Sequence, residues 1–265
     1  MKTFNYQRAT TLADAVARLK ASADGKALAG GMTLLPTMKL RLAQPSDLVD
    51  LGALSELRGI KRGAERLAIG ALTRHAEVAA SPEVRAAIPA LAALAGGIGD
   101  AQVRNRGTLG GSVANNDPAA DYPAAVLGLD ASVHTDRRTL TADKFFTGMF
   151  ATALAPGELI RAIEFRIPKR AGYAKFPNPA SRYAMAGVLV ADFGGEVRVA
   201  VTGAGPGVFR VAAFEAALKK SFAPGALAGI SVPEAGLNSD LHGSAAYRAH
   251  LVGVLAQRAV ASALG

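Results

Sequence analysis

The stretch that decides our interpretation of the sequence reads Thr108-Leu109-Gly110-Gly111-Ser112-Val113-Ala114-Asn115-Asn116-Asp117-Pro118-Ala119-Ala120-Asp121. Its glycine pair lies between two hydroxyl side chains, and Asn115, Asp117 and Asp121 follow. A glycine pair lets the backbone approach a diphosphate closely, and a carboxylate can accept hydrogen bonds from both hydroxyls of a ribose. The stretch therefore predicts a nucleotide-binding segment, although a solvated loop with Asx turns would use the same residue types.

The chain around this stretch is rich in turn-forming residues from position 103 to position 123, and Gly96-Gly97-Ile98-Gly99-Asp100 precedes it. No helix interior would accept the glycines of that run, because glycine is costly there. The composition of 103–123 predicts an irregular segment. A compact domain rarely keeps such a long irregular segment without a function for it, so we expect a site here.

A second glycine pair lies in Leu28-Ala29-Gly30-Gly31-Met32-Thr33-Leu34-Leu35. We predict a strand over 26–29 before it and a helix over 34–42 after it. The N-terminus of a helix offers free N–H groups and a partial positive charge, which suits a phosphate, and Thr33 adds a hydroxyl. An ordinary turn between a strand and a helix would also use glycine, so both interpretations stay open.

A third glycine-containing run, Gly203-Ala204-Gly205-Pro206-Gly207, resembles the turn of a Rossmann fold. The third glycine of that fingerprint would fall at Val208. Pro206 removes an N–H group that a phosphate would use. We therefore predict a plain turn from a strand to a helix.

The order of predicted elements indicates an α+β chain with a boundary near residue 170. Before the boundary we expect further strands over 47–51, 66–71, 131–135 and 159–167, and helices after Thr11, over 73–79 (capped by Thr73), over 81–95 and over 124–129. Leu159, Ile163, Phe165 and Ile167 should share one strand face, with Arg161 also on it. After the boundary we expect a hairpin of 186–193 and 196–202 at Gly194-Gly195, and helices over 211–220 and 244–264.

Composition narrows the function classes. The chain has 265 residues and a net charge of +9, but its basic residues are scattered and form no stacking platform, so we predict no nucleic-acid partner. It has no cysteine, which excludes a cysteine-ligated iron–sulfur cluster of its own. No metal motif and no catalytic motif can be recognised, and His75 is interpreted as part of a polar helix face. No apolar run is long enough for a transmembrane segment, so we expect a cytoplasmic protein.

Taken in order, these segments resemble the FAD-binding medium subunit of the molybdenum hydroxylases, the family of carbon monoxide dehydrogenase and xanthine dehydrogenase. Each segment is weak by itself, but their order and spacing over nearly the whole chain are specific. The resemblance rests on Phe4-Asn5-Tyr6, Ala29-Gly30-Gly31, Met38-Lys39-Leu40, Leu48-Val49-Asp50-Leu51, Ile69-Gly70-Ala71-Leu72-Thr73, Gln102-Val103-Arg104-Asn105-Arg106-Gly107-Thr108, Gly110-Gly111, Asp117-Pro118-Ala119-Ala120-Asp121, Pro156-Gly157-Glu158, Gly172-Tyr173-Ala174-Lys175-Phe176 and Asp240-Leu241-His242.

The resemblance implies an FAD-binding fold of the vanillyl-alcohol-oxidase (PCMH) type over 1–170. It implies subdomains of about 1–55 and 56–170 with FAD between them, and a C-terminal α+β domain with a small antiparallel sheet over 171–265. The two glycine segments would hold the diphosphate, and Asp121 would bind the ribose region. The implied cofactor-binding residues are Leu28, Ala29, Gly30, Gly31, Met32, Thr33, Leu34, Leu35, Ile98, Thr108, Gly110, Gly111, Ser112, Asn115, Asp117, Asp121, Ile160 and Tyr183.

One segment departs from the family pattern. Asn178 stands where relatives tend to have a basic residue, and Arg182 where many have an aspartate. The resemblance implies that this segment faces the isoalloxazine ring, beside Tyr183. A changed charge there could alter the redox potential of the flavin or its electron acceptor.

The resemblance further implies a role in electron transfer. The chain would take electrons from [2Fe-2S] clusters of a small subunit and pass them to NAD, a quinone or oxygen, while a large subunit with the molybdenum cofactor oxidises the substrate. The expected assembly is a dimer of heterotrimers, either free in the cytoplasm or associated with a membrane through the complex. An assembly or sensor subunit that binds FAD or a nucleotide without redox turnover remains the alternative, and a basic nucleic-acid-binding protein is a third hypothesis.

Overall fold

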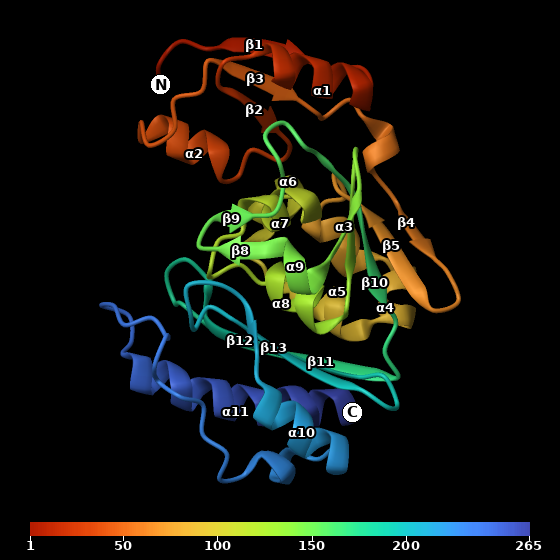
Figure 1. The fold of residues 1–265 in the computed structure, drawn as a ribbon, viewed down its shortest axis with the longest axis vertical. Helices are drawn as coiled ribbons and strands as arrows, with labels where there is room; N and C mark the ends of the chain where they lie inside the picture. The colour runs from red at the N-terminus through yellow and green to blue at the C-terminus, as the bar shows by residue number, and fades with distance from the viewer.

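The computed structural model describes residues 1–265, and its elements stack in three tiers along the longest axis of the molecule (Figure 1). The N-terminal tier holds a three-stranded parallel sheet in the order β1-β3-β2. Its elements are β1 (Asn5–Arg8), α1 (Leu12–Ala21), β2 (Gly25–Leu28), α2 (Leu34–Lys39) and β3 (Asp47–Asp50). The hydroxyl of Thr11 accepts a hydrogen bond from the N–H of Asp14 and caps α1, as the sequence predicts.

The middle tier is a five-stranded antiparallel sheet in the order β4-β5-β10-β6-β7, with helices packed against it. A two-stranded hairpin, β8–β9, lies at its side. The elements are η1 (Ser55–Leu57), β4 (Ile60–Arg62), β5 (Arg66–Gly70), α3 (His75–Ala80), α4 (Pro82–Ala87), α5 (Pro89–Gly96), α6 (Ala101–Arg106), α7 (Leu109–Asn115), α8 (Tyr122–Gly128), β6 (Ser132–Thr135), β7 (Thr139–Thr141), α9 (Ala142–Phe145), β8 (Phe146–Gly148), β9 (Ala151–Thr152) and β10 (Ile160–Arg166).

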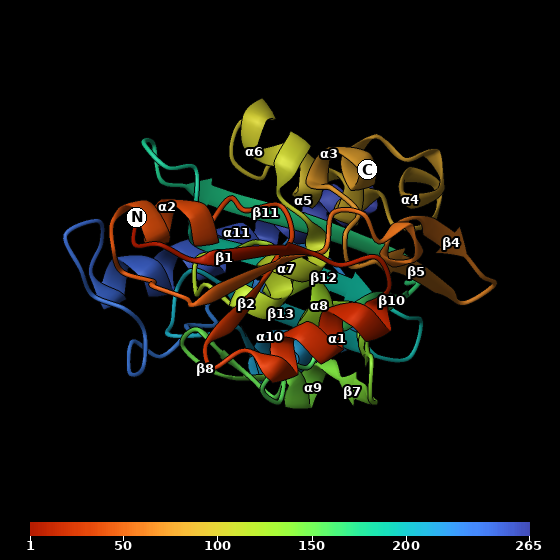
Figure 2. The same cartoon turned by 90° about the horizontal axis from the view of Figure 1, so that it is seen from above.

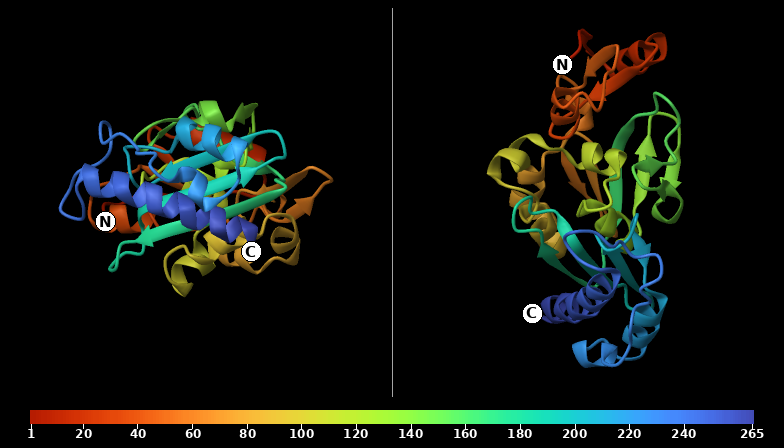
Figure 3. Two further views of the ribbon diagram at one scale, coloured as in Figure 1. Left: turned by 90° about the horizontal axis from the view of Figure 1, so that it is seen from below. Right: turned by 90° about the vertical axis from the view of Figure 1, so that its left-hand side faces the viewer.

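The C-terminal tier is a four-stranded antiparallel sheet in the order β11-β12-β13-β14, and two helices cover the face that points away from the middle tier (Figures 1 and 3). The predicted hairpin at Gly194-Gly195 is the β12–β13 pair. The elements are β11 (Arg170–Pro177), β12 (Ala184–Asp192), β13 (Val197–Thr202), β14 (Phe209–Arg210), α10 (Ala212–Lys220), η2 (Pro224–Leu227) and α11 (Ala245–Leu264).

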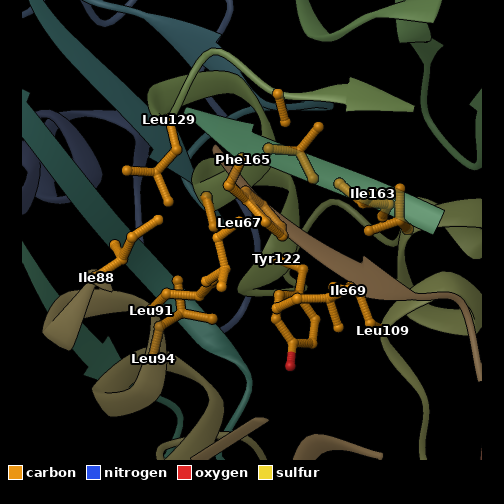
Figure 4. Close-up of a cluster of buried hydrophobic side chains, with 14 of the residues drawn as sticks. Leu67, Ile69, Ile88, Leu91, Leu94, Leu109, Tyr122, Leu129, Ile163 and Phe165 are labelled. Carbon is orange, nitrogen blue, oxygen red and sulfur yellow. The ribbon is translucent and has the colours of Figure 1, made fainter. Parts of the chain in front are cut away.

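Strand β12 joins the middle and C-terminal tiers through its two faces. All nine of its residues are buried. Val188 and Val190 pack with α10 and α11, whereas Leu189 and Ala191 belong to the core of the middle tier. Because side chains alternate across a strand, one strand can seal two cores. The middle core also contains Leu67, Ile69, Tyr122, Ile163 and Phe165 (Figure 4).

Segment 103–123 is not irregular, so this prediction was wrong. Three short helices, α6, α7 and α8, cover most of it. Each begins where the sequence offers an N-terminal signal: the side chain of Asp100 caps α6, that of Thr108 caps α7, and Pro123 stands in the first turn of α8. These helices are only six or seven residues long, so turn-forming residues at their caps and in their first turns give the whole segment a composition like that of a loop.

Other predicted boundaries also need correction. The helix expected over 81–95 breaks at Ile88, because Pro89 cannot donate the hydrogen bond that would continue α4. Thr73 does not cap α3; Arg74 precedes that helix, and the Thr73 hydroxyl bonds to the backbone of Gly59. The glycine run after β13 leads into strand β14 before α10 begins, so it is not a direct turn into a helix.

The alternation of side chains predicted that Arg161 shares the buried face of strand β10, and this prediction was wrong. Ile163 and Phe165 are buried, but Arg161 is exposed. The pairing of β10 with β6 shifts register between Ile160 and Ala162. Such a bulge inserts a residue and changes which face the preceding side chains occupy, so both Ile160 and Leu159 are buried.

Candidate functional site

A cavity of about 740 Å³ lies where the N-terminal and middle tiers meet, and residues of the turn between β11 and β12 also line it. Its size falls within the range of roughly 300–1,000 Å³ that small-molecule sites occupy. Figure 2 shows the N-terminal tier lying across the middle tier. Every residue that the sequence predicted to bind a cofactor lines this cavity except Leu35, whose side chain packs beside Gly31.

The first glycine segment presents unpartnered backbone donors. The N–H groups of residues 30–33 donate no hydrogen bond within the chain. Gly31 has φ +75°, a left-handed conformation that glycine adopts without strain. The hydroxyl of Thr33 does not cap α2, so the start of that helix is also open. Successive free N–H groups in a turn form a concave site for an anion, and these residues line the cavity.

The second glycine segment differs from the first because the protein itself uses its backbone N–H groups. The N–H of Leu109 donates to the carbonyl of Thr73, and that of Gly110 donates to Ala71. The N–H of Gly111 donates to the hydroxyl of Thr108 at 3.2 Å. The first three N–H groups of α7 therefore all have protein partners, and this segment offers a ligand its helix dipole and side chains rather than free backbone donors.

The two glycine segments contact each other across the tiers. A Cβ atom on Gly30 would collide with the backbone carbonyl of Arg106 and would lie 2.9 Å from the Cα of Gly107. A Cβ atom on Gly111 would lie 3.8 Å from the Cβ of Ala29. Glycine is therefore required at position 30 because two backbones pass at closest approach. The two segments are 80 residues apart in the sequence, and together they form one wall of the cavity.

Asp121 lines the cavity and is 4% exposed. Its Oδ1 is 2.9 Å from Nζ of Lys175 and accepts a hydrogen bond of 2.6 Å from the hydroxyl of Tyr173. Burial raises the pKa of Asp121, and the ammonium of Lys175 opposes that rise. Lys175 also donates to the carbonyls of Gly97 and Arg182, so it ties β11 to the residues around the cavity.

The turn between β11 and β12 brings Tyr183 and Arg182 to the cavity. The N–H of Asn178 donates to Tyr183, and the N–H of Arg182 donates to Asn178, which closes the turn. Arg182 has φ +63°, and its Nη1 donates a hydrogen bond of 3.4 Å to the carbonyl of Gly99. Burial, followed by the charges of Asp117 and Asp121, raises the pKa of Tyr183.

The sequence missed several residues of the cavity wall, among them His75, Phe150 and Glu158. His75 does not lie on a polar helix face: it is 4% exposed, and its ring packs against that of Tyr122 in a tilted arrangement, with 5.3 Å between the ring centroids. Burial and the charge of Arg104 lower its pKa to about 4. Glu158 is buried in a two-point ion pair with Arg138, which lowers its pKa to about 2. Glu158 stands in the Pro156-Gly157-Glu158 segment of the family resemblance, but no local sequence signal places His75 or Phe150 at the cavity, because their positions depend on long-range packing.

The fold and the cavity fit a class of α+β proteins that bind an anionic ligand between the N-terminal and middle tiers. The free N–H groups suit a diphosphate, and 19 of the 37 residues of the cavity wall are hydrophobic, which suits aromatic rings. The residues present therefore fit FAD.

Comparison with known proteins agrees with this class. Residues 2–170 match the family described as the FAD binding domain in molybdopterin dehydrogenase. The chain is 35% identical to the carbon monoxide dehydrogenase medium chain of Hydrogenophaga pseudoflava, covering 98% of this chain and 96% of the relative. It is 37% identical to the nicotine 6-hydroxylase medium subunit of Paenarthrobacter nicotinovorans, covering 99% and 98%. The reconstituted carbon monoxide dehydrogenase of Oligotropha carboxidovorans superposes with a TM-score of 0.90 at 32% identity, covering 99% and 98%.

The chain belongs to the family of FAD-binding subunits of molybdenum hydroxylases. The resemblance seen in the sequence is confirmed, as is the FAD-binding α+β fold of the PCMH type. The protein is an oxidoreductase subunit whose cofactor is FAD. No helix has the length and apolar character needed to cross a membrane.

Proposed function

We propose that FAD binds in the cavity between the N-terminal and middle tiers. The unpartnered N–H groups of residues 30–33 carry this proposal, because they are the run of free backbone donors in the cavity wall. They would hold the diphosphate, and Thr108 and Gly111 would support them from the opposite segment. Asn115, Asp117 and Ile160 would lie along the cofactor, and Ile98 and Tyr183 would contact it on the side of the β11–β12 turn.

Asp121 has a more limited role in this proposal than the sequence suggested. Its Oδ1 already serves Lys175 and Tyr173. Only its second oxygen remains for a ribityl or ribose hydroxyl. Its principal contribution would be to hold α8 and β11 together beneath the cofactor.

The proposed role is electron transfer within a larger complex. Bound FAD accepts one or two electrons and can deliver a pair. The chain has no cysteine, so [2Fe-2S] clusters must come from another polypeptide. Relatives are named as medium chains or medium subunits, which implies small and large partners. We propose a dimer of heterotrimers in the cytoplasm, in which this chain passes electrons from the clusters to NAD, a quinone or oxygen.

Within this chain we propose three units. Residues 1–55 and 56–170 would be the two lobes that enclose FAD, and 171–265 the C-terminal domain. Each unit has its own group of buried hydrophobic residues, though Leu57, Leu72 and Leu159 join the first group from the middle tier, and Leu189, Ala191 and Ala200 join the second from the C-terminal sheet. The lobes would exclude water from the cofactor, and the third unit would hold the β11–β12 turn in place.

The function can be tested on the purified complex. After anaerobic reduction with dithionite, rapid mixing with NAD, a quinone or oxygen should restore the absorbance of oxidised flavin. A complex stripped of FAD is the control, and its reduced clusters should not react with the same acceptor at the same rate. A flavin that none of the three acceptors reoxidises would favour an assembly or sensor role instead.

A further inference from the structure

The tip of the β8–β9 hairpin carries two exposed apolar side chains. Met149 is 54% exposed and Phe150 is 58% exposed. Phe150 belongs to the cavity wall, but Met149 does not. Phe150 also has φ +53°, in the left-handed region. The hairpin therefore presents an aromatic ring at the cavity in a strained backbone conformation.

Both features of Phe150 are unfavourable in the chain alone. A left-handed backbone strains a residue with a Cβ atom, and an exposed ring gives up the stabilisation that burial would supply. Strained residues of this kind concentrate at functional sites, where surrounding contacts hold them in place.

Asn116 makes the hydrogen bonds that hold Phe150 and the hairpin tip in place. Its Nδ2 donates to the carbonyls of Gly148 and Ala151, each at 2.8 Å, one on either side of the hairpin tip. The backbone carbonyl of Asn116 accepts a hydrogen bond of 3.2 Å from the N–H of Phe150. Asn116 is 1% exposed, so these three hydrogen bonds are shielded from water.

Asn116 also shapes the cofactor wall. It ends α7 with φ +45° and ψ +50°, a conformation that asparagine tolerates better than most residues. Its neighbours on both sides, Asn115 and Asp117, line the cavity. One buried residue therefore fixes both the end of α7 and the position of the hairpin tip.

We propose that Phe150 covers bound FAD at the mouth of the cavity and that Asn116 is the positioning residue that holds it there. This inference rests on the proposed placement of FAD in this cavity. The ring would limit the access of solvent and small solutes to the flavin. Its exposed surface would become buried when FAD binds, which accounts for an aromatic ring being held in a strained conformation.

The first test compares two neighbouring substitutions in the full chain loaded with FAD. Phe150→Ala should raise the rate of FAD dissociation about tenfold, equivalent to about 1.4 kcal/mol, and should increase quenching of flavin fluorescence by iodide. Met149→Ala is the matched control, because Met149 is similarly exposed but lies outside the cavity wall; it should change neither. Equal effects of the two substitutions, or no effect of Phe150→Ala, would overturn the inference.

The second test concerns Asn116. Asn116→Gly keeps the left-handed backbone but removes the amide that holds the hairpin. It should reproduce the increased quenching, and the double variant with Phe150→Ala should add little, because both remove the same cover. Fully additive effects would contradict the assigned role. If Asn116→Gly does not fold, the comparison of positions 149 and 150 still decides.

Two further results would each overturn a different part of the proposal. If Phe150→Ala leaves FAD unaffected but weakens assembly with the partner subunits, the ring serves a protein contact and its role as a cover fails. If the unsubstituted chain retains no FAD, or binds it with the glycine segments accessible, the proposed site fails instead.

Discussion

Nζ of Lys175 lies 2.9 Å from Oδ1 of Asp121, and this ion pair joins the C-terminal sheet to the wall of the cavity between the N-terminal and middle tiers. The two residues come from β11 and from the start of α8, and Asp121 is 4% exposed. The ion pair makes the cavity dependent on a tier that lies outside the two lobes.

Removing Lys175 should expose this dependence. Lys175→Met leaves a buried carboxylate without its counter-ion, which should cost about 3–5 kcal/mol of the free energy of unfolding. Burial already raises the pKa of Asp121 above its unfolded value, and loss of the ammonium should raise it further. The variant should therefore lose stability as pH rises through the folded pKa. Chemical denaturation at several pH values measures this, and Asp121→Asn added to Lys175→Met should remove the pH dependence.

Gly30→Ala should separate the two glycine segments. The added Cβ would collide with the backbone of Arg106, which cannot move as a flexible side chain can. We expect at least about a tenfold loss of FAD affinity, or ~1.4 kcal/mol, measured by fluorescence titration of the apoprotein. Gly195→Ala is the control, because open space surrounds that position. Unchanged affinity in Gly30→Ala would show that the close approach of the segments is not needed.

Thr108→Ala should weaken both α7 and the cofactor site. The hydroxyl of Thr108 caps α7 by accepting from Gly111, and loss of such a cap costs about 1 kcal/mol. We expect FAD affinity to fall several-fold in titrations, since α7 carries cavity residues from Gly110 to Asn115. Thr108→Ser keeps the oxygen and should bind like the unsubstituted chain; a serine variant as weak as the alanine variant would point to the methyl group instead.

Arg182 should influence the redox potential of the flavin. It lines the cavity, and its guanidinium donates to a neutral carbonyl, that of Gly99, so its charge is available to a reduced, anionic flavin. Arg182→Asp should lower the two-electron midpoint potential, by about 30 mV for each tenfold loss in preference for the reduced form. Spectroelectrochemistry measures the shift. Arg182→Gly removes the charge and tolerates φ +63°, so its midpoint potential should lie between those of the unsubstituted chain and Arg182→Asp. An unchanged potential in both variants would exclude the effect.

His75 should make stability fall in acid. Its pKa is lowered from 6.5 to about 4, so the unfolded chain binds the proton more tightly than the folded chain does. The contribution is complete above pH 6.5 and is lost as pH falls towards 4, a change of about 3 kcal/mol. Denaturation of the full chain between these pH values tests this. His75→Gln should flatten the acid slope in that window; the same slope in both proteins would assign it to other groups.

Much of the architecture follows from local sequence. The hydroxyl and acid at positions 11 and 14 are enough to start α1, and Gly194-Gly195 is enough to turn β12 into β13, because caps and tight turns use contacts only a few residues apart. Strand β1 was not predicted, since its polar residues Asn5, Gln7 and Arg8 show no apolar alternation and only pairing with β3 defines it.

The features of the site likewise fall into those that local sequence indicates and those that only packing determines. The sequence by itself marked two glycine pairs, 80 residues apart, as candidate cofactor-binding segments, because glycine is a local requirement of close backbone approach, and the family resemblance favoured this interpretation over ordinary turns. Only the tertiary structure decided that the N–H groups of Gly30 and Gly31 stay free while those of Gly110 and Gly111 are used by the protein. Whether a backbone donor is free depends on partners such as Ala71 that are distant in sequence, and packing alone brings them together.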